Sequence, residues 1–285
     1  MIKSFSKEAD ALTVAAEVRM ERQKHKGSFL LVEGATDIKR FRKLVAEDMC
    51  SFVNCFGKPN VIGAIEQLYD DGLLGCLGLF DADFDRLRQR LLEHEGLVAS
   101  ETHDFDLDMV LTSALMSYLE EVGDSAKIEQ IGGSGAVGDF LLQALKPLSA
   151  MRYANEKHGL GYSLESVSLQ DFFDGNAIDV DAMVASVSWG RMNTSEHKET
   201  LKNYIERYVK SAIDLRQVTS GHDFCEALGI SLRNKAGDRK PPQTWRSEIE
   251  LHLRLTCDRE HFDETNFCNN VRRWENENIP FRVLI

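Results

Sequence analysis

The sequence predicts an α/β fold with a parallel sheet, followed by a largely helical C-terminal region. The apolar run Leu74–Phe80 has no polar alternation, which is typical of a strand buried on both faces of a parallel sheet. Predicted strands alternate with segments of helical spacing in the first part of the chain. A shift in composition between residues 125 and 150 leads us to expect an α/β core over residues 1–130 and helices over residues 131–285.

Short apolar runs and helical spacing give the elements of the core. We expect strands at Ser28–Glu33, Ser51–Phe56, Leu74–Phe80 and Leu97–Ser100. Between and beside them we expect helices at Glu8–Lys26, Ala35–Glu47, Pro59–Asp70, Phe84–His94 and Asp108–Glu121. Proline is favourable in the first turn of a helix, which supports a helix start at Pro59.

The C-terminal half shows mostly helical spacing. We expect helices at Ala136–Leu145, Val180–Val187, Glu196–Leu215, Asp223–Leu228, Glu248–Leu255 and Cys268–Glu277, and a short strand with a turn within Ser163–Asp174. The glycine-rich stretch Ile131–Gly138 lacks the Lys-Ser/Thr pair of a phosphate-binding loop, so we expect an ordinary loop there. The basic stretch Arg233–Arg246 is expected to be an exposed loop.

The composition is that of an ordinary globular protein, with 43% hydrophobic and 28% charged residues. No apolar segment is long enough to span a bilayer, and the N-terminus lacks the apolar stretch of a signal peptide. Six cysteines without a CxxC pair are typical of reduced thiols and argue against a thiolate zinc site. We therefore expect a cytoplasmic protein without membrane contact. A net charge of −12 argues against a simple DNA-binding module.

Acidic residues follow several of the predicted strands. The carboxyl ends of parallel strands lie on one edge of a sheet, where open α/β sheets bind their ligands. Carboxylates gathered at one edge repel each other unless a cation lies between them, and Mg²⁺ or Mn²⁺ prefers such oxygen ligands. The alternative is that these acids are solvated turn residues, or that Thr102 or Asp104 caps the following helix. The acids expected to converge are Glu33, Asp81, Asp83, Asp106 and Asp108.

The motifs around these acids resemble a known family. VEGATD followed by LFDADFD resembles the Toprim domain, which has a Glu-Gly after its first strand and a DxD after its third. With CFGKPNV, THDFDLD and SGHDFCEALG, the pattern is similar to the stand-alone Toprim proteins related to OLD nucleases, a family that includes the Toprim effectors of the PARIS anti-phage system. The resemblance implies a Toprim-like sheet with helices on both faces, covering about Ser28–Leu111, and a metal-dependent nuclease.

Individual positions take roles from this resemblance. Glu33 matches the Toprim glutamate, which is a general acid/base or a metal ligand. Aspartate at position 108, where a glutamate is usual, and His103, where an acid is frequent, depart from the family pattern and weaken the case for a second metal ion. The resemblance further implies RNA such as transfer RNA as the substrate and an ATPase as partner. The implied Mg²⁺ or Mn²⁺ ligands are Glu33, Asp37, Asp81, Asp83, Asp106 and Asp108.

Further residues are candidates for substrate contacts. Lys58, in the turn after the second strand, is the cation best placed to assist a leaving oxygen, or is simply a solvated lysine. His222 and Asp223 either orient a substrate or cap the following helix. Aromatic side chains that either stack on bases or pack in the core are Tyr69, Phe84 and Trp245. The basic residues predicted to bind nucleic acid are Arg233, Lys235, Arg239, Lys240 and Arg246.

Other functions are compatible with the same sequence. The chain could be a non-catalytic docking subunit of an ATPase partner, with the amphipathic segment Glu196–Leu215 as a partner or homodimer surface. It could also be a DNA nuclease, because one fold serves many substrates. Phosphoryl transfer through an aspartate would place that aspartate after the first strand, where this chain has Glu33-Gly34.

Overall fold

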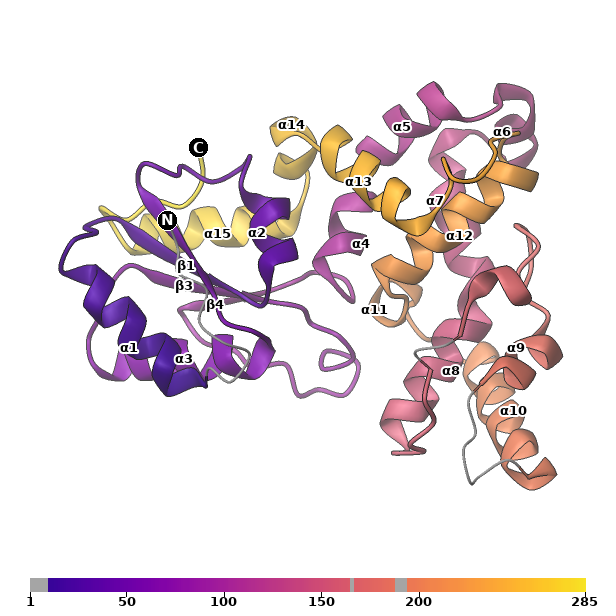
Figure 1. Cartoon of the computed structure of the whole chain (residues 1–285), viewed down its shortest axis with the longest axis horizontal. Coiled ribbons are helices and arrows are strands. Elements are labelled where there is room, and N and C mark those ends of the chain that lie inside the picture. The colour runs from indigo at the N-terminus through magenta and orange to yellow at the C-terminus, as the bar shows by residue number, and fades with distance from the viewer. Residues whose placement is uncertain (1–9, 165–166, 188–193) are drawn as a thin grey trace. The chain divides into compact units, whose positions relative to one another are not determined.

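A computed structural model describes residues 10–164, 167–187 and 194–285. The chain forms two compact units, and we describe each by itself (Figure 1). The sheet unit comprises residues 1–82, 90–101 and 258–285, and the helical unit comprises residues 83–89 and 102–257. The chain therefore leaves the sheet unit twice and returns to it twice.

The sheet has four parallel strands in the order β2-β1-β3-β4. This confirms the predicted α/β class and is consistent with a Toprim-like core. Every residue of β1 and β3 is buried, as expected for strands with an uninterrupted apolar sequence. In the register, Leu31 of β1 lies beside Gly78 of β3, so the residues that follow these two strands are neighbours. The strands are β1 Ser28–Val32, β2 Cys50–Asn54, β3 Cys76–Phe80 and β4 Leu97–Ala99.

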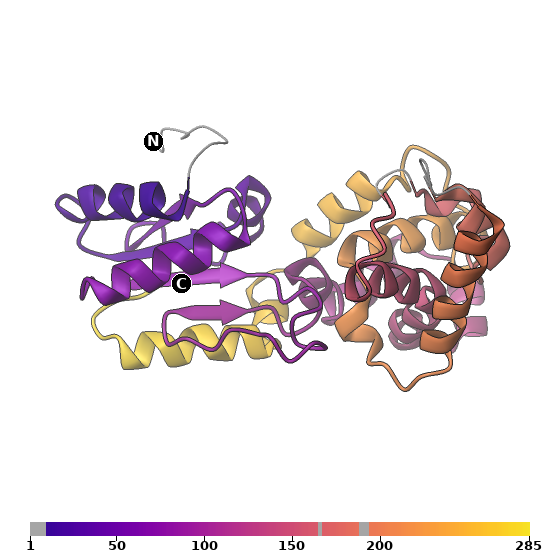
Figure 2. The ribbon, with the colours of Figure 1, turned by 90° about the horizontal axis from the view of Figure 1, so that it is seen from below.

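Helices cover both faces of the sheet. The helices α1 and α3 pack against each other on one face, and α15 lies on the opposite face (Figure 2). Val61, Ile65 and Leu68 recur at helical spacing on α3, and all three side chains are fully buried in the core of this face. The helices of this unit are α1 Ala11–Arg22, α2 Ala35–Phe41, α3 Lys58–Asp70, α14 Arg259–Asp263 and α15 Asn266–Glu277.

The two units do not follow the predicted division at residue 130. Residues 258–285 return to the sheet unit, where α15 packs against β4. Trp274 of α15 is 3% exposed, and its indole N–H donates to the hydroxyl of Tyr69 on α3 at 3.1 Å. A buried parallel sheet must be covered by helices on both faces. The helix α15 covers one of these faces, although it lies far beyond residue 130 in the sequence.

The helical unit packs its helices around one large apolar core. The helix α12 contacts α4, α7 and α13, and its residues Phe224 and Leu228 are fully buried. The elements of this unit are α4 Phe105–Val110, α5 Ala114–Val122, α6 Ser125–Ile131, α7 Ser134–Ala144, α8 Lys146–Lys157, the 3₁₀ turn η1 Leu169–Asp171, α9 Val180–Ser186, α10 Ser195–Val209, α11 Leu215–Val218, α12 Gly221–Asn234 and α13 Arg246–Thr256.

The segment predicted as a helix over Phe84–His94 contains no helix: residues 84–89 form turns, and residues 90–94 have no regular secondary structure. Asp83 and Gln89 have positive φ angles of 48° and 53°, which a right-handed helix excludes. Phe84 packs with the aromatic residues of α8 in the helical unit, whereas Leu91 packs in the core of the sheet unit. Because the two ends of the segment belong to different cores, tertiary packing overrides its helical spacing.

Other elements differ in extent from the prediction. The expected helix Asp108–Glu121 is interrupted between α4 and α5, where the Thr112 hydroxyl donates to the carbonyl of Met109 and competes with helical bonding. The expected strand within Ser163–Asp174 is replaced by η1, and its residues 165 and 166 lie outside the described residues, as do residues 8 and 9 of the first predicted helix.

The cysteines and the apolar content of the helices agree with the expectations from composition. All six cysteines are buried, and none forms a disulfide. Throughout the part of the chain that the structure describes, no helix is both long enough and apolar enough to cross a bilayer.

The close packing of α3 on the sheet gives a stability prediction. A methyl group on Gly78 of β3 would lie 2.7–2.9 Å from side-chain atoms of Leu97, Ile65 and Val61. We expect Gly78→Ala to lower the free energy of unfolding by about 1–3 kcal/mol, the usual cost of overpacking a core, in a urea unfolding experiment.

Gly135→Ala is the matched control for this substitution. Gly135 lies in α7, and a methyl group there would be 3.7 Å from the Met116 sulfur, an ordinary contact. Because alanine favours the helix, Gly135→Ala should leave stability unchanged or raise it by up to about 1 kcal/mol. Equal destabilisation by the two substitutions would contradict the close packing on β3.

Candidate functional site

Glu33, Lys58 and Asp81 meet at the carboxyl edge of the sheet. Glu33 follows β1, and Asp81 follows the neighbouring strand β3. The backbone N–H of Asp81 donates to Oε1 of Glu33 at 2.8 Å, and Nζ of Lys58 donates to the backbone carbonyl of Asp81 at 2.7 Å. All three residues are partly exposed, so solvent reaches this edge. The predicted proximity of Glu33 and Asp81 is therefore present within the sheet unit.

The turn between β2 and α3 places Lys58 in this group. The Gly57 N–H donates to the carbonyl of Glu33 at 2.9 Å, which ties the turn to the end of β1. Gly57 has a φ of 126°, a backbone conformation that is unfavourable for residues other than glycine. Lys58 then begins α3, with Pro59 in the first turn, as the sequence predicted for the helix start. The Lys58 ammonium also lies 5.3 Å from the centre of the Phe80 ring, a favourable cation–π distance.

Asp37 has structural contacts at the start of α2. Its Oδ2 accepts a hydrogen bond at 2.9 Å from the N–H of Gly34, the N-cap residue of α2. Its Oδ1 pairs with Arg40, a residue only 4% exposed. Arginine so deeply buried requires a partner charge. Asp37 thus stabilises α2, a structural role beside the predicted metal-binding one.

The remaining predicted acids belong to the helical unit. The Asp83 N–H donates to the carbonyl of His103 at 2.7 Å. Asp108 is 7% exposed, and its Oδ1 accepts from the backbone N–H and the hydroxyl of Thr102 at 2.7 and 2.6 Å. Asp108 therefore fixes the turn before α4. Asp106 approaches His222 of α12, with 3.8 Å between Oδ2 and Nδ1.

Asp104 caps α4, as one alternative reading of the sequence proposed. Its Oδ1 accepts from the Leu107 N–H at 2.8 Å, and its Oδ2 accepts from the Gly221 N–H at 2.8 Å. The second bond joins the start of α4 to the start of α12. Burial raises the pKa of Asp104, while the neighbouring His103 acts in the opposite direction.

His222 and Asp223 have separate partners, and neither caps α12. The cap is Ser220, whose hydroxyl accepts from the His222 N–H at 3.2 Å. Asp223 pairs through both carboxylate oxygens with Arg152 of α8, at 2.5 and 2.8 Å. Arg152 lines a cavity of about 490 Å³ together with Phe84 and His222. Nothing in the sequence singled out Arg152, because its partner lies far along the chain.

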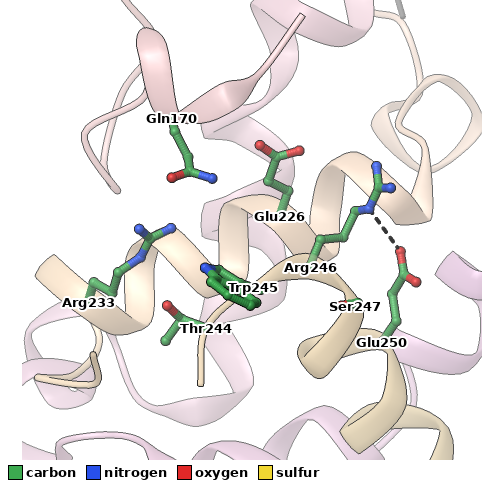
Figure 3. A pocket seen from close by; sticks show the side chains of 8 residues that line it. All are labelled: Gln170, Glu226, Arg233, Thr244, Trp245, Arg246, Ser247 and Glu250. Carbon is green, nitrogen blue, oxygen red and sulfur yellow. Dashed lines mark ion pairs between the residues drawn. The ribbon is translucent and has the colours of Figure 1, made fainter. Parts of the chain in front are cut away.

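The predicted basic residues have different surroundings. Arg239 donates to the carbonyls of Val122 and Glu121 at 2.8 and 3.3 Å, so it satisfies the C-terminal end of α5. Lys235 is the residue after α12, and Lys240 is exposed. Arg233 and Arg246 line a second cavity of about 340 Å³ beside Trp245 (Figure 3). The expected loop over Arg233–Arg246 is therefore shorter than predicted, since α12 extends through Asn234.

The aromatic candidates also differ from one another. Tyr69 packs in the sheet unit and accepts from Trp274. The Phe84 ring packs at a tilted angle against His103, with 4.7 Å between ring centres, and against Tyr153 at 5.3 Å. Trp245 is 53% exposed, which leaves a large part of its indole available to a ligand.

His222 gives a prediction about pH. A hydrogen bond at 2.8 Å from His222 to Glu250 raises the pKa of the imidazole. Desolvation lowers this pKa, and the negative charges of Asp106, Glu250 and Asp104 raise it further, so the net shift is upward. Because the folded-state pKa is the higher one, this pair stabilises the fold fully below the unfolded pKa of about 6.5. That contribution is lost as the pH rises through the folded-state pKa.

We therefore expect His222→Gln to be less stable than the wild type in mildly acidic buffer, with the difference shrinking in alkaline buffer, when thermal unfolding is followed over pH. As a control, Glu250→Gln should shift the His222 pKa measured by NMR back toward its ordinary value. A stability difference that grows with pH would contradict the assigned pairing.

No protein-family model matches the chain, and no curated protein sequence is significantly similar to it. The Toprim resemblance therefore stays a prediction from the motifs VEGATD and LFDADFD. The structure agrees with it in fold class, and it places the acids of these two motifs, Glu33 and Asp81, side by side.

Proposed function

We propose that this chain is a metal-dependent nuclease that hydrolyses phosphodiester bonds at the sheet edge formed by Glu33, Lys58 and Asp81. The observation that carries the proposal is the hydrogen bond of 2.8 Å from the Asp81 N–H to the Glu33 carboxylate. It joins acids from segments 48 residues apart at the ends of neighbouring strands. Open α/β sheets bind their ligands at this edge.

The carboxylate oxygens of Glu33 and Asp81 are chemically suited to bind Mg²⁺ or Mn²⁺. Carboxylate oxygens are the ligands that hard divalent cations prefer. Among the described residues, no three His, Cys, Asp or Glu side chains form a complete metal cage. Mg²⁺ usually keeps several waters and takes only one or two carboxylates together with substrate phosphates, so Glu33 and Asp81 suffice as its protein ligands. A bound ion of this kind would neutralise phosphate charge and acidify a water molecule.

The chain's own residues supply the remaining chemistry. The Glu33 carboxylate is oriented by the Asp81 N–H and can accept a proton from an attacking water. Lys58, held by the Asp81 carbonyl at 2.7 Å, brings a positive charge to the same edge. A fixed cation at this place stabilises the negative charge that develops on the phosphoryl oxygens and the leaving oxygen.

The motif resemblance supports the substrate and the setting. RNA and DNA are both polyanions, so the net charge of −12 does not choose between them. We propose RNA, such as transfer RNA, as the substrate because the motifs resemble those of effectors that act on RNA. The resemblance to anti-phage effectors supports a role in defence within the cytoplasm, under the control of an ATPase partner.

The role of Glu33 can be tested by substitution. We expect the purified chain to cleave RNA in the presence of Mg²⁺ or Mn²⁺, and EDTA to abolish cleavage. Glu33→Ala should lower the cleavage rate by at least about 100-fold, because it removes a metal ligand and a proton acceptor together. Gel-resolved cleavage of labelled transfer RNA provides the measurement.

Glu66→Ala is the matched control for Glu33→Ala, because Glu66 is an exposed glutamate of α3 in the same unit. It should cleave at the wild-type rate. The proposal fails if the wild-type chain cleaves neither RNA nor DNA with either metal, or if Glu33→Ala cleaves as fast as Glu66→Ala. Cleavage of DNA alone would support the nuclease but not the proposed RNA substrate.

Lys58 can be tested separately from the metal ligands. Lys58→Met keeps most of the side-chain length but removes the charge, so we expect kcat to fall by roughly 100-fold. The Mg²⁺ concentration that gives half-maximal activity should change much less, because the carboxylates remain. A large rise in this concentration with an unchanged kcat would show that Lys58 acts in metal binding instead.

A further inference from the structure

The cavity of about 340 Å³ in the helical unit lies between α12, η1 and the start of α13 (Figure 3). Its volume is within the range of small-molecule sites. Trp245 lies between the side chains of Arg233 and Arg246, and Gln170 points toward the cavity from η1 (Figure 3). The residues that line the cavity are Gln170, Glu226, Arg233, Thr244, Trp245, Arg246, Ser247 and Glu250.

Arg233 contributes a positive charge that no described carboxylate neutralises. Its only hydrogen bond among the described residues runs from Nε to the Gly229 carbonyl at 3.4 Å, within α12. Arg246, by contrast, pairs with Glu250 at 3.4 Å (Figure 3). Guanidinium groups recognise phosphate through several N–H donors at once, so Arg233 is suited to an anionic ligand.

The start of α13 contributes backbone donors to the same cavity. Arg246 and Ser247 line the cavity and form the first turn of this helix of 11 residues. Trp245 occupies the cap position, and no side chain accepts from the first amides. Uncapped amides at a helix N-terminus carry partial positive charge and favour a phosphate.

Thr244 supplies independent support for a ligand. It is 1% exposed and lines the cavity, yet its hydroxyl has no hydrogen-bond partner among the described residues. A buried hydroxyl without a partner costs free energy unless a ligand or water completes its bonding. A phosphate oxygen in the cavity would serve this purpose.

The two acids of the lining have other partners. Glu226 accepts from the Leu169 N–H at 3.1 Å and so holds η1 in place. Burial and the charge of Asp223 raise the pKa of Glu226, while Arg246 and the hydrogen bonds from Leu169 and Ser168 lower it. Glu250 is shared by His222 at 2.8 Å and Arg246 at 3.4 Å. Neither acid pairs with Arg233.

We propose that this cavity binds a nucleotide, with its phosphate held by Arg233, the first amides of α13 and the Thr244 hydroxyl, and its base stacked on Trp245. The half-exposed indole beside these groups is a stacking surface for bases of any identity. The nucleotide belongs either to a single RNA strand or to a free mononucleotide. The choice of RNA rests on the proposed nuclease function, whereas phosphate recognition rests on the cavity itself.

Binding can be measured without catalysis by fluorescence anisotropy of a labelled, 5′-phosphorylated single-stranded RNA with the full chain in EDTA. We expect Arg233→Ala to weaken binding about tenfold, because it removes a charge-assisted contact worth about 1.4 kcal/mol. Trp245→Ala should weaken it roughly 5- to 150-fold, and Trp245→Phe much less, since phenylalanine also stacks. Unpaired Arg233 and exposed Trp245 tolerate these changes without loss of the core.

Lys240→Ala is the matched control, because Lys240 belongs to the same basic stretch, is exposed and does not line the cavity. It should change binding less than about twofold, a difference well below that of one charge-assisted contact. Equal weakening by Arg233→Ala and Lys240→Ala would overturn the proposal, since it would indicate general attraction to basic surface. Absence of any binding would overturn it as well.

Competition by AMP and adenosine distinguishes the source of the nucleotide. Displacement by AMP but not by adenosine supports a site that accepts a free mononucleotide. No displacement by AMP, together with Arg233-dependent RNA binding, supports an RNA strand as the ligand. Equal displacement by AMP and adenosine overturns phosphate recognition.

The outcome is separable from that of the nuclease proposal. If Glu33→Ala cleaves normally while Arg233→Ala loses RNA binding, the proposed active site fails and the nucleotide site stands. The reverse result removes the nucleotide site and leaves the sheet edge as the active site.

Discussion

The parallel sheet has no polar face, and this constraint organises the sheet unit. Strands β1 and β3 are buried along their whole length, so both sides of the sheet must be covered. The N-terminal segments supply α1 and α3 to one side, and α15 covers the other (Figure 2). The same parallel arrangement brings the carboxyl ends of β1 and β3 together, which is why Glu33 and Asp81 become neighbours.

Much of the sheet unit could be predicted from sequence, because its signals are local. The four strands and the helix beginning near Pro59 follow from apolar runs, helical spacing and turn residues. The division of the chain into two units, with α15 in the sheet unit, could not be predicted from local patterns. The role of α15 depends on contacts such as Trp274 with Tyr69, which no local pattern encodes. Phe84–His94 failed as a helix because its two ends pack in different cores.

Some features of the candidate site also follow from local sequence signals, and others depend on tertiary contacts. Proximity of Glu33 and Asp81 follows from strand order, so sequence reasoning reached it. The functions of the other acids depend on hydrogen-bond and ion-pair partners that can be identified only in the folded structure. Asp37 and Asp108 have the same chemistry as Asp81, yet one pairs with buried Arg40 and the other fixes the turn at Thr102. Acids near strand ends thus comprise both edge residues and caps, and periodicity does not separate them.

The route of the chain has a consequence for how the protein is made. Residues 102–257 are inserted into the sheet unit, whose last segment begins at Asp258. A ribosome releases the N-terminal strands first, but their second cover, α15, emerges only after the inserted helices. Since domains fold as units during synthesis, the inserted helices can complete their core before the sheet does. The nascent sheet thus exposes one apolar side until α15 has been synthesised, and a chain truncated before Asp258 would keep that side uncovered.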